Sequence, residues 1–79
     1  TVNSSLVSVR EILIESLKHL AVNVILLHNH PSGDPSPSKA DIDITKNINN
    51  ALNSIGIELI DHIVIGDNCY YSFKEQGII

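Results

Sequence analysis

Two histidines and one aspartate are spaced as the ligands of a metal ion would be. His28 and His30 are separated by one residue, and on an extended chain alternate side chains lie on the same face. Both imidazoles can therefore point at one place, and Asp41 follows where a helical pattern begins. Two imidazoles and one carboxylate are the ligands of a catalytic zinc centre that keeps its fourth position for water. The spacing predicts a zinc site at these three residues.

The same residues also fit purely structural roles, and the spacing by itself leaves both interpretations open. Ser38 and Asp41 form a Ser-x-x-Asp sequence at a helix start, which is typical of a capping box, and the helix dipole stabilises a carboxylate in the first turn. A single histidine at this place is readily explained as a hydrogen-bonded turn residue. Short motifs produce false positives, so the surrounding elements have to support one interpretation.

The elements on either side of the histidines favour a site. The apolar run Val24–Leu27 is expected to be a central strand covered by helices on both faces. A strand that ends in two histidines delivers them to the carboxyl edge of a sheet, where open α/β sheets usually bind ligands. Residues 31–37 include three prolines and one glycine, and this restricted loop can hold the ligands at its two ends at a fixed separation.

The rest of the chain has the pattern of an α/β domain. Ser8 and Glu11 are predicted to form a capping box, and residues 1–7 are expected to be the end of an earlier element. The predicted elements are helices over residues 8–22 and 38–55, strands over 57–65 and 69–73, and a turn at 66–68 that joins these strands into a hairpin.

Three other reactive side chains are not assigned to a site. His19 and His62 have no partner at ligand spacing and are interpreted as a surface residue and a strand-edge residue. Cys69 has no base at a recognisable spacing, so a packing role is expected for it rather than a nucleophilic one.

Composition excludes several classes of function. Five of the 79 residues are Lys or Arg, they are scattered, and the net charge is −4, so no basic patch marks a nucleic-acid interface. Aromatic residues make up only 4% of the chain, which leaves little surface on which bases could stack. No apolar run approaches the ~20 residues of a membrane span. A single cysteine excludes an internal disulfide and is compatible with a reducing cytoplasm.

The sequence around the histidines resembles a known family. The order His28-x-His30, seven residues, Ser38, two residues, Asp41 resembles the JAMM signature of the MPN/JAB metalloproteases. The fuller run over residues 28–38 resembles the RadC-like branch of bacterial and phage proteins. The similarity continues through residues 41–45 and 59–66 to Ser72-Phe73 and so covers nearly the whole chain.

This resemblance implies a fold and a role for each site residue. It implies one α/β domain over residues 1–79, with a mixed sheet flanked by helices in the JAB/MPN (cytidine-deaminase-like) architecture. It also implies that His28, His30 and Asp41 bind Zn²⁺ and that the Ser38 hydroxyl donates to the oxyanion formed during hydrolysis. The zinc deaminase reaction is rejected, because it needs paired cysteines and a His-x-Glu sequence that the chain lacks.

One part of the family's site has no counterpart in the sequence. The JAMM site uses a glutamate as general base on a strand before the first helix, and in RadC-like chains that position precedes the segment matching Thr1. No glutamate of the chain corresponds to it; the four are Glu11, Glu15, Glu58 and Glu75. The sequence is therefore expected to be an N-terminally truncated portion of a longer protein that keeps the metal ligands but is inactive.

The leading hypothesis is zinc-dependent hydrolysis of a peptide or isopeptide bond by a cytoplasmic protein. Because the RadC-like family is labelled DNA repair, the alternative is a non-catalytic repair accessory or a protein-interaction module. Direct nucleic-acid binding by this segment is not expected, since the segment is acidic. A sheet edge left unpaired would favour a homodimer.

Overall fold

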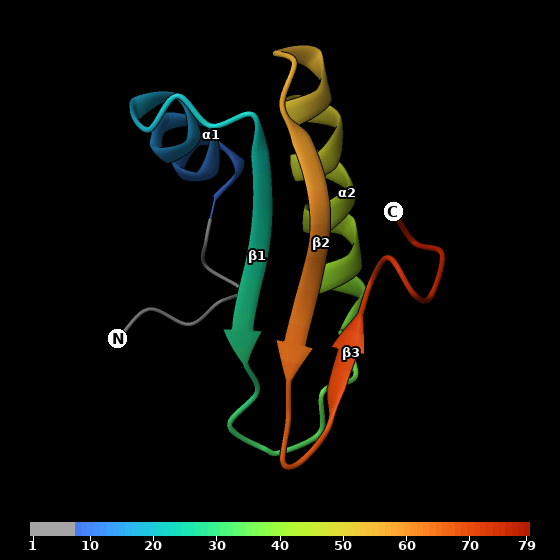
Figure 1. Cartoon of the computed structure of the whole chain (residues 1–79). Helices are drawn as coiled ribbons and strands as arrows, with labels where there is room; N and C mark the ends of the chain where they lie inside the picture. Colours follow the sequence, from blue (N-terminus) through green and yellow to red (C-terminus); the bar gives the residue numbers. More distant parts are fainter. Residues whose placement is uncertain (1–7) are drawn as a thin grey trace.

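A computed structural model of the chain describes residues 8–79, so the expectation for residues 1–7 lies outside the described part. Two helices and three strands follow one another along the chain (Figure 1). They are α1 (Val9–Lys18), β1 (Asn23–Asn29), α2 (Lys39–Ser54), β2 (Glu58–Ile65) and β3 (Tyr70–Ser72). None of the helices in this part of the chain is long and apolar enough to cross a membrane.

The three strands form one mixed sheet in the order β1-β2-β3. β1 and β2 run parallel, and β2 and β3 run antiparallel as a hairpin (Figure 1). A parallel pair needs a crossover connection, and α2 supplies it. The predicted α/β fold with a mixed sheet and a terminal hairpin is confirmed.

A bulge in β2 decides which of its side chains face the helices. Leu59 and Asp61 pair with consecutive residues of β1, so Ile60 is an extra residue in β2. One inserted residue moves every following side chain to the opposite face of a strand. Leu59 and His62 therefore both point toward the helices, and both are buried.

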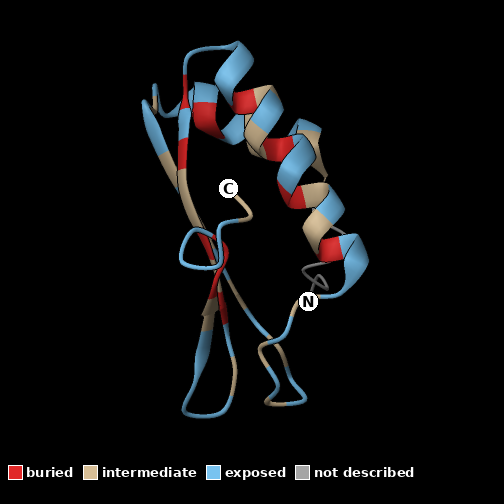
Figure 2. Ribbon diagram, turned by 90° about the vertical axis from the view of Figure 1, so that its right-hand side faces the viewer, coloured by how far each residue is buried: buried red, intermediate tan, exposed pale blue. Residues whose placement is uncertain are grey.

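Both helices pack on the same face of the sheet, and the core lies between them and the strands (Figure 2). The core is built around Ile48, Leu52, Ile57 and Leu59, each no more than 5% exposed. The prediction that Val24–Leu27 is a central strand covered on both faces is wrong for the described residues. β1 lies at the edge of this sheet, and its apolar side chains on the other face, Ile25 and Leu27, are 54% and 62% exposed.

The helix starts agree with the sequence, with one difference in detail. Ser8 caps α1 by accepting from the backbone N–H of Glu11, at 3.1 Å. The Glu11 carboxylate accepts from the Ser8 hydroxyl, also at 3.1 Å, rather than from the cap's backbone as predicted. Ser38 and Asp41 form the complete reciprocal capping box at the start of α2.

The first helix ends at Lys18, four residues before its predicted end. Leu20 adopts a left-handed conformation (φ 52°), and with Ala21 it closes α1 by the two backbone hydrogen bonds of a Schellman motif. The second helix ends in the same motif, in which Gly56 (φ 78°) takes the left-handed position. Since leucine rarely adopts this conformation, the sequence around Leu20 carries no stop signal.

Candidate metal centre

The three predicted ligands come together at one end of the parallel strand pair. β1 carries His28 near its carboxyl end, His30 follows directly after the strand, and Asp41 lies in the first turn of α2. One ligand atom from each residue lies within 4.8 Å of the other two. The sequence separation of eleven residues between His30 and Asp41 is thus closed by the fold.

The proline-rich loop between His30 and Asp41 rests on the turn between β2 and β3. The Asp67 N–H donates to the Gly33 carbonyl at 2.8 Å, and the Gly33 N–H donates to the His30 carbonyl at 3.0 Å. Gly66 lies so close to the loop that a Cβ there would collide with the Gly33 carbonyl oxygen and with Pro35. The hairpin therefore serves as the base on which the ligand-bearing loop is fixed.

The ring of His30 is oriented by a hydrogen bond to the loop. Its Nδ1 lies 2.9 Å from the carbonyl oxygen of Asp34. Because a carbonyl oxygen only accepts, Nδ1 must donate, and Nε2 of the neutral ring is left with its lone pair. That Nε2 lies 3.6 Å from Oδ2 of Asp41.

The ring of His28 has one nitrogen engaged and the other unpartnered. Its Nδ1 lies 2.9 Å from Nε2 of His62 on the neighbouring strand. Its Nε2 is buried and has no hydrogen-bond partner among the described residues. Burial, together with the neighbouring His30, lowers the pKa of His28 below its usual 6.5, against the opposing effect of Asp41. A buried nitrogen without a partner is unusual and points to a missing ligand.

Asp41 is a buried residue (7% exposed), and its carboxylate is held by the start of α2. Its Oδ2 accepts from the backbone N–H of Ser38 at 3.0 Å. Burial acts to raise the pKa of Asp41, but the hydrogen bonds from Ser38 and the proximity of His28 and His30 outweigh this effect and lower it. A carboxylate and two neutral imidazoles are the protonation forms that a metal ion requires.

Ser38 contributes to the helix cap without using its hydroxyl proton there. Its Oγ accepts from the backbone N–H of Asp41 at 3.1 Å. Since the oxygen is the acceptor in this bond, the hydroxyl proton is available to a group bound beside the ligands. The capping interpretation of Ser38 and Asp41 is confirmed, and it is compatible with a role in a site.

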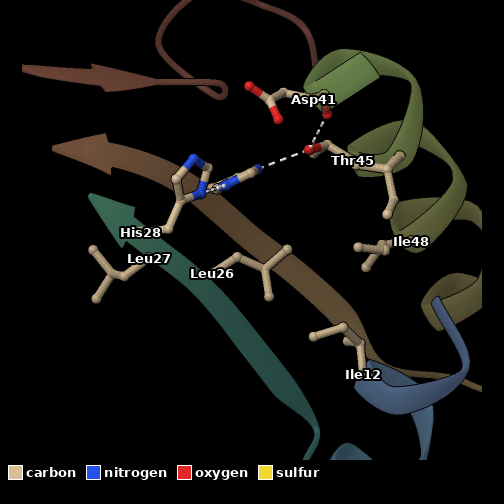
Figure 3. Close-up of a pocket in the computed structure, with 9 residues that line it drawn as sticks. Ile12, Leu26, Leu27, His28, Asp41, Thr45 and Ile48 are labelled. Carbon is tan, nitrogen blue, oxygen red and sulfur yellow. Dashed lines mark hydrogen bonds between the residues drawn. The ribbon is translucent and has the colours of Figure 1, made fainter. Parts of the chain in front are cut away.

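A cavity of about 140 Å³ adjoins the ligands (Figure 3). Its polar end is formed by His28, Asp41 and Thr45, and its walls are aliphatic side chains from both helices and β1, including Ile12, Leu26 and Ile48. The site is thus lined on one side by apolar surface.

Two residues that join the site were not recognised from the sequence. His62 is 6% exposed and stacks on Phe73, with ring centroids 4.5 Å apart, so its interpretation as a strand-edge residue is wrong. Burial lowers the pKa of His62 to about 4, and His28 adds to this effect. Thr45 is fully buried and hydrogen-bonds to Nδ1 of His62 at 2.7 Å. The bulge at Ile60 turns His62 inward, and no simple alternation of side chains reveals it.

The remaining candidates lie away from the centre. The side chain of His19 is 76% exposed, which confirms its interpretation as a surface residue. Cys69 is a free, exposed cysteine, so the prediction that it packs is wrong. Among residues 8–79, no glutamate belongs to the ligand group or lines the cavity.

Comparisons with known proteins identify related chains. A family model described as the RadC-like JAB domain matches residues 1–78. The chain is 53% identical to a UPF0758 protein of Clostridium botulinum (strain Hall) and 51% identical to one of Desulfitobacterium hafniense (strain DCB-2), in both cases over all 79 residues. These residues correspond to 35% of each relative, so the chain spans about a third of the length of the curated proteins it matches.

Proposed function

We propose, since the chain belongs to the RadC-like JAB domain family, that it binds one zinc ion and that this zinc serves the hydrolysis of a peptide or isopeptide bond. The ligands are Nε2 of His28, Nε2 of His30 and one carboxylate oxygen of Asp41. Membership of this family agrees with the resemblance seen in the sequence. The hydrolytic activity is proposed for proteins of the length of the curated relatives, of which this chain matches about a third.

The observation that carries the proposal is the unpartnered Nε2 of His28. It is buried, it belongs to one of three residues that each bring a possible ligand atom within 4.8 Å of the others, and its lone pair has no hydrogen-bond donor among residues 8–79. Leaving such a buried acceptor unsatisfied costs about 1–3 kcal/mol. A bound cation removes that cost, and two imidazoles with one carboxylate match the preference of zinc for nitrogen and oxygen ligands.

Each side chain of the centre has a definite task in this proposal. A zinc ion held there lowers the pKa of a bound water and polarises a carbonyl group. Asp41 supplies the negative charge, and its orientation is fixed by the Ser38 N–H. The Ser38 hydroxyl donates a hydrogen bond to the oxyanion that develops on the substrate. Loss of such a donor typically lowers the rate by a factor of ~10²–10³. The general base is expected upstream of Thr1, by resemblance to the family.

Metal content is the first test. The purified chain and its His28→Ala, His30→Ala double variant are saturated with zinc, freed of excess metal and measured by plasma emission spectrometry. About one zinc per chain, lost in the double variant, is the expected result. A folded wild-type chain that retains no zinc contradicts the proposal.

Hydrolysis is tested separately, on peptide and isopeptide substrates that fluoresce when cleaved. A full-length UPF0758 relative is expected to cleave such a bond and to lose activity when the histidine corresponding to His28 is replaced by alanine. The 79-residue chain is expected to bind zinc but to cleave far more slowly. Cleavage by this chain at the rate of the full-length relative would contradict the assignment of the general base.

A further inference from the structure

We propose that His62 and Thr45 are positioning residues for the metal centre: they hold His28 in the tautomer that carries its proton on Nδ1 and aims the Nε2 lone pair at the metal. This inference rests on the proposed zinc site and deepens it. Neither residue is a ligand, and each acts through His28. Each hydrogen bond in the series behind His28 can run in only one direction.

The direction of these hydrogen bonds is determined at the end farthest from His28, where a backbone carbonyl oxygen accepts. Oγ1 of Thr45 lies 2.7 Å from the carbonyl oxygen of Asp41, four residues earlier in α2 (Figure 3). A carbonyl oxygen has no proton to give, so the single hydroxyl proton of Thr45 must lie in this bond. Thr45 can then only accept from its other neighbour, Nδ1 of His62, at 2.7 Å. His62 is therefore protonated on Nδ1.

The tautomer of His62 dictates that of His28. With its proton on Nδ1, the neutral His62 ring presents a lone pair at Nε2, which lies 2.9 Å from Nδ1 of His28. That bond needs a proton, and only His28 can supply it. His28 thus carries its proton on Nδ1, and its buried Nε2 is left as a bare lone pair. The reverse arrangement would set two lone pairs or two protons against each other at one of these contacts.

Packing keeps these rings where the bonds require them. Thr45 is 0% exposed and His62 is 6% exposed. The His62 ring lies flat against Phe73, with an angle of 13° between the ring planes, and Phe73 is itself fully buried. A buried hydrogen-bonded ring between an aromatic face and a helix has little freedom to rotate. The orientation of His28 is therefore inherited from the rigid interior of the domain.

The same series of hydrogen bonds also connects two of the three proposed ligands, His28 and Asp41, on the side away from the proposed metal. It begins at His28, passes through His62 and Thr45, and ends at the backbone of Asp41, whose carboxylate belongs to the ligand group. Partners that orient a ligating histidine through its second nitrogen commonly change metal affinity by about 10–100-fold when they are removed. A loss of this size is expected when the Thr45 hydroxyl is removed.

The test combines the tautomer of the metal-free chain with its zinc affinity. Long-range ¹H–¹⁵N NMR spectra distinguish the protonated from the bare ring nitrogen of each histidine. In the wild-type chain, His28 and His62 are expected to be protonated on Nδ1 alone. Thr45→Val, which replaces the hydroxyl with a methyl group, should give a mixture of tautomers at both rings and weaken zinc binding about 10–100-fold, measured by competition with a coloured chelator. Thr45→Ser keeps the hydroxyl and should retain a single tautomer and near-wild-type affinity.

Ser16→Ala is the matched control. The Ser16 hydroxyl is also buried and also donates to the carbonyl four residues earlier, that of Ile12, at 2.7 Å. Its loss should lower thermal stability but leave the tautomers and the zinc affinity unchanged. If Thr45→Val changes stability alone, as Ser16→Ala does, the positioning role is overturned.

The wild-type chain provides a test that does not depend on any variant folding. A proton found on Nε2 of His28 in the metal-free chain at neutral pH overturns the inference. If the chain binds no zinc but shows the single predicted tautomer, the zinc proposal fails and the metal-directed role of His62 and Thr45 fails with it. If zinc binds normally to Thr45→Val, only the positioning role fails.

Discussion

In both His28 and His30, a backbone carbonyl determines which ring nitrogen carries the proton. That carbonyl contacts His30 directly but acts on His28 only through other side chains. For His30 the deciding group is the Asp34 carbonyl, in direct contact with its Nδ1. For His28 it is the Asp41 carbonyl, reached through His62 and Thr45. Both arrangements leave the lone pair on the same nitrogen, Nε2, and in His30 this atom lies 3.6 Å from Oδ2 of Asp41. A neutral imidazole oriented by a partner on its second nitrogen is the usual form of a ligating histidine.

Asp61, which lies outside the candidate centre, also fixes the local structure through the hydrogen bonds of its carboxylate. Asp61 accepts from the Ser72 hydroxyl and from the backbone N–H groups of Lys74 and His62. Burial acts to raise the pKa of Asp61, but these hydrogen bonds outweigh burial and hold it below its usual 3.8. The carboxylate thus ties β2 to the segment after β3 and fixes the residue next to His62.

We expect Asp61→Asn to lower the free energy of unfolding by about 1–3 kcal/mol at pH 7, since an amide replaces a charged acceptor. A lowered folded-state pKa means that the stabilisation is present above pH 3.8 and is lost as the pH falls through the folded-state value. The wild type and the variant should therefore converge in urea unfolding as the pH is lowered below about 4. Asp43→Asn, at an exposed ion pair with Lys39, is the control and should change stability little at either pH. An undiminished difference at low pH would contradict the role assigned to the Asp61 charge.

Among the helices and strands, the sequence predicted those features that depend on residues close together in the chain. Both helix starts, the end of α2 and the terminal hairpin follow from caps, a glycine and turn residues. The proximity of His28, His30 and Asp41 follows from strand alternation and spacing. His62 and Thr45 could not be predicted in this way. Their bonds join residues 17 and 34 positions apart, and a single bulge residue decides which side of β2 enters the core. Such an irregularity depends on tertiary packing and leaves no periodic signal.

The end of α1 allows a comparison between two ways of closing a helix. Leu20 and Gly56 hold equivalent left-handed positions in the two Schellman motifs, but only leucine has a Cβ that this conformation strains. The Leu20 side chain is 87% exposed, so it contributes little packing in return. We therefore expect Leu20→Gly to raise the free energy of unfolding by up to about 1 kcal/mol, measured by urea denaturation. Leu20→Ala keeps the Cβ and should give no such gain; an equal gain in both variants would mean that exposure of the leucine, not strain, is relieved.

At the scale of the whole molecule, the site depends on a contact between segments that lie far apart in the sequence. The loop after His30 rests on the turn between β2 and β3, and the absence of a side chain at Gly66 permits this approach. The three proposed ligands are thus held between the strand pair, the start of α2 and the terminal hairpin. Any change that lifts the loop from the hairpin should displace His30 relative to Asp41.

Gly66→Ala tests this dependence. The new Cβ would meet backbone atoms of the loop rather than a flexible side chain, so the loop must move. We expect a loss of about 1–3 kcal/mol in unfolding free energy, as for other overpacked positions, together with weaker zinc binding. Gly56→Ala is the control: it strains a left-handed residue (φ 78°) after the end of α2 but meets nothing within 4 Å, so it should lower stability and leave zinc affinity unchanged. Unchanged zinc affinity in a destabilised Gly66→Ala chain would show that the loop does not set the ligand geometry.

The edge position of β1 leads to a prediction about association. On its outer side the strand has no neighbour among residues 8–79, and Ile25 on its uncovered face is 54% exposed. Unpaired strand edges next to apolar surface promote pairing between chains, so we expect this chain to form a homodimer, detected by light scattering at increasing concentration. Ile25→Lys should shift it to the monomer, whereas Leu17→Lys, at an equally exposed residue of α1, should not. A wild-type chain that stays monomeric at high concentration contradicts the expectation.

The capping box at Ser38 has a consequence for how occupancy of the centre could be followed. The carboxylate of Asp41 both accepts the Ser38 N–H and belongs to the ligand group, so any cation that binds this carboxylate also fixes the first turn of α2. Opening of that turn, which releases backbone amides to exchange with solvent deuterium, then requires release of the cation. The exchange rates of the amides of Ser38 and Asp41 should therefore fall as the centre is filled. The exchange rates of the amides at the end of the helix, near Ser54, should stay unchanged.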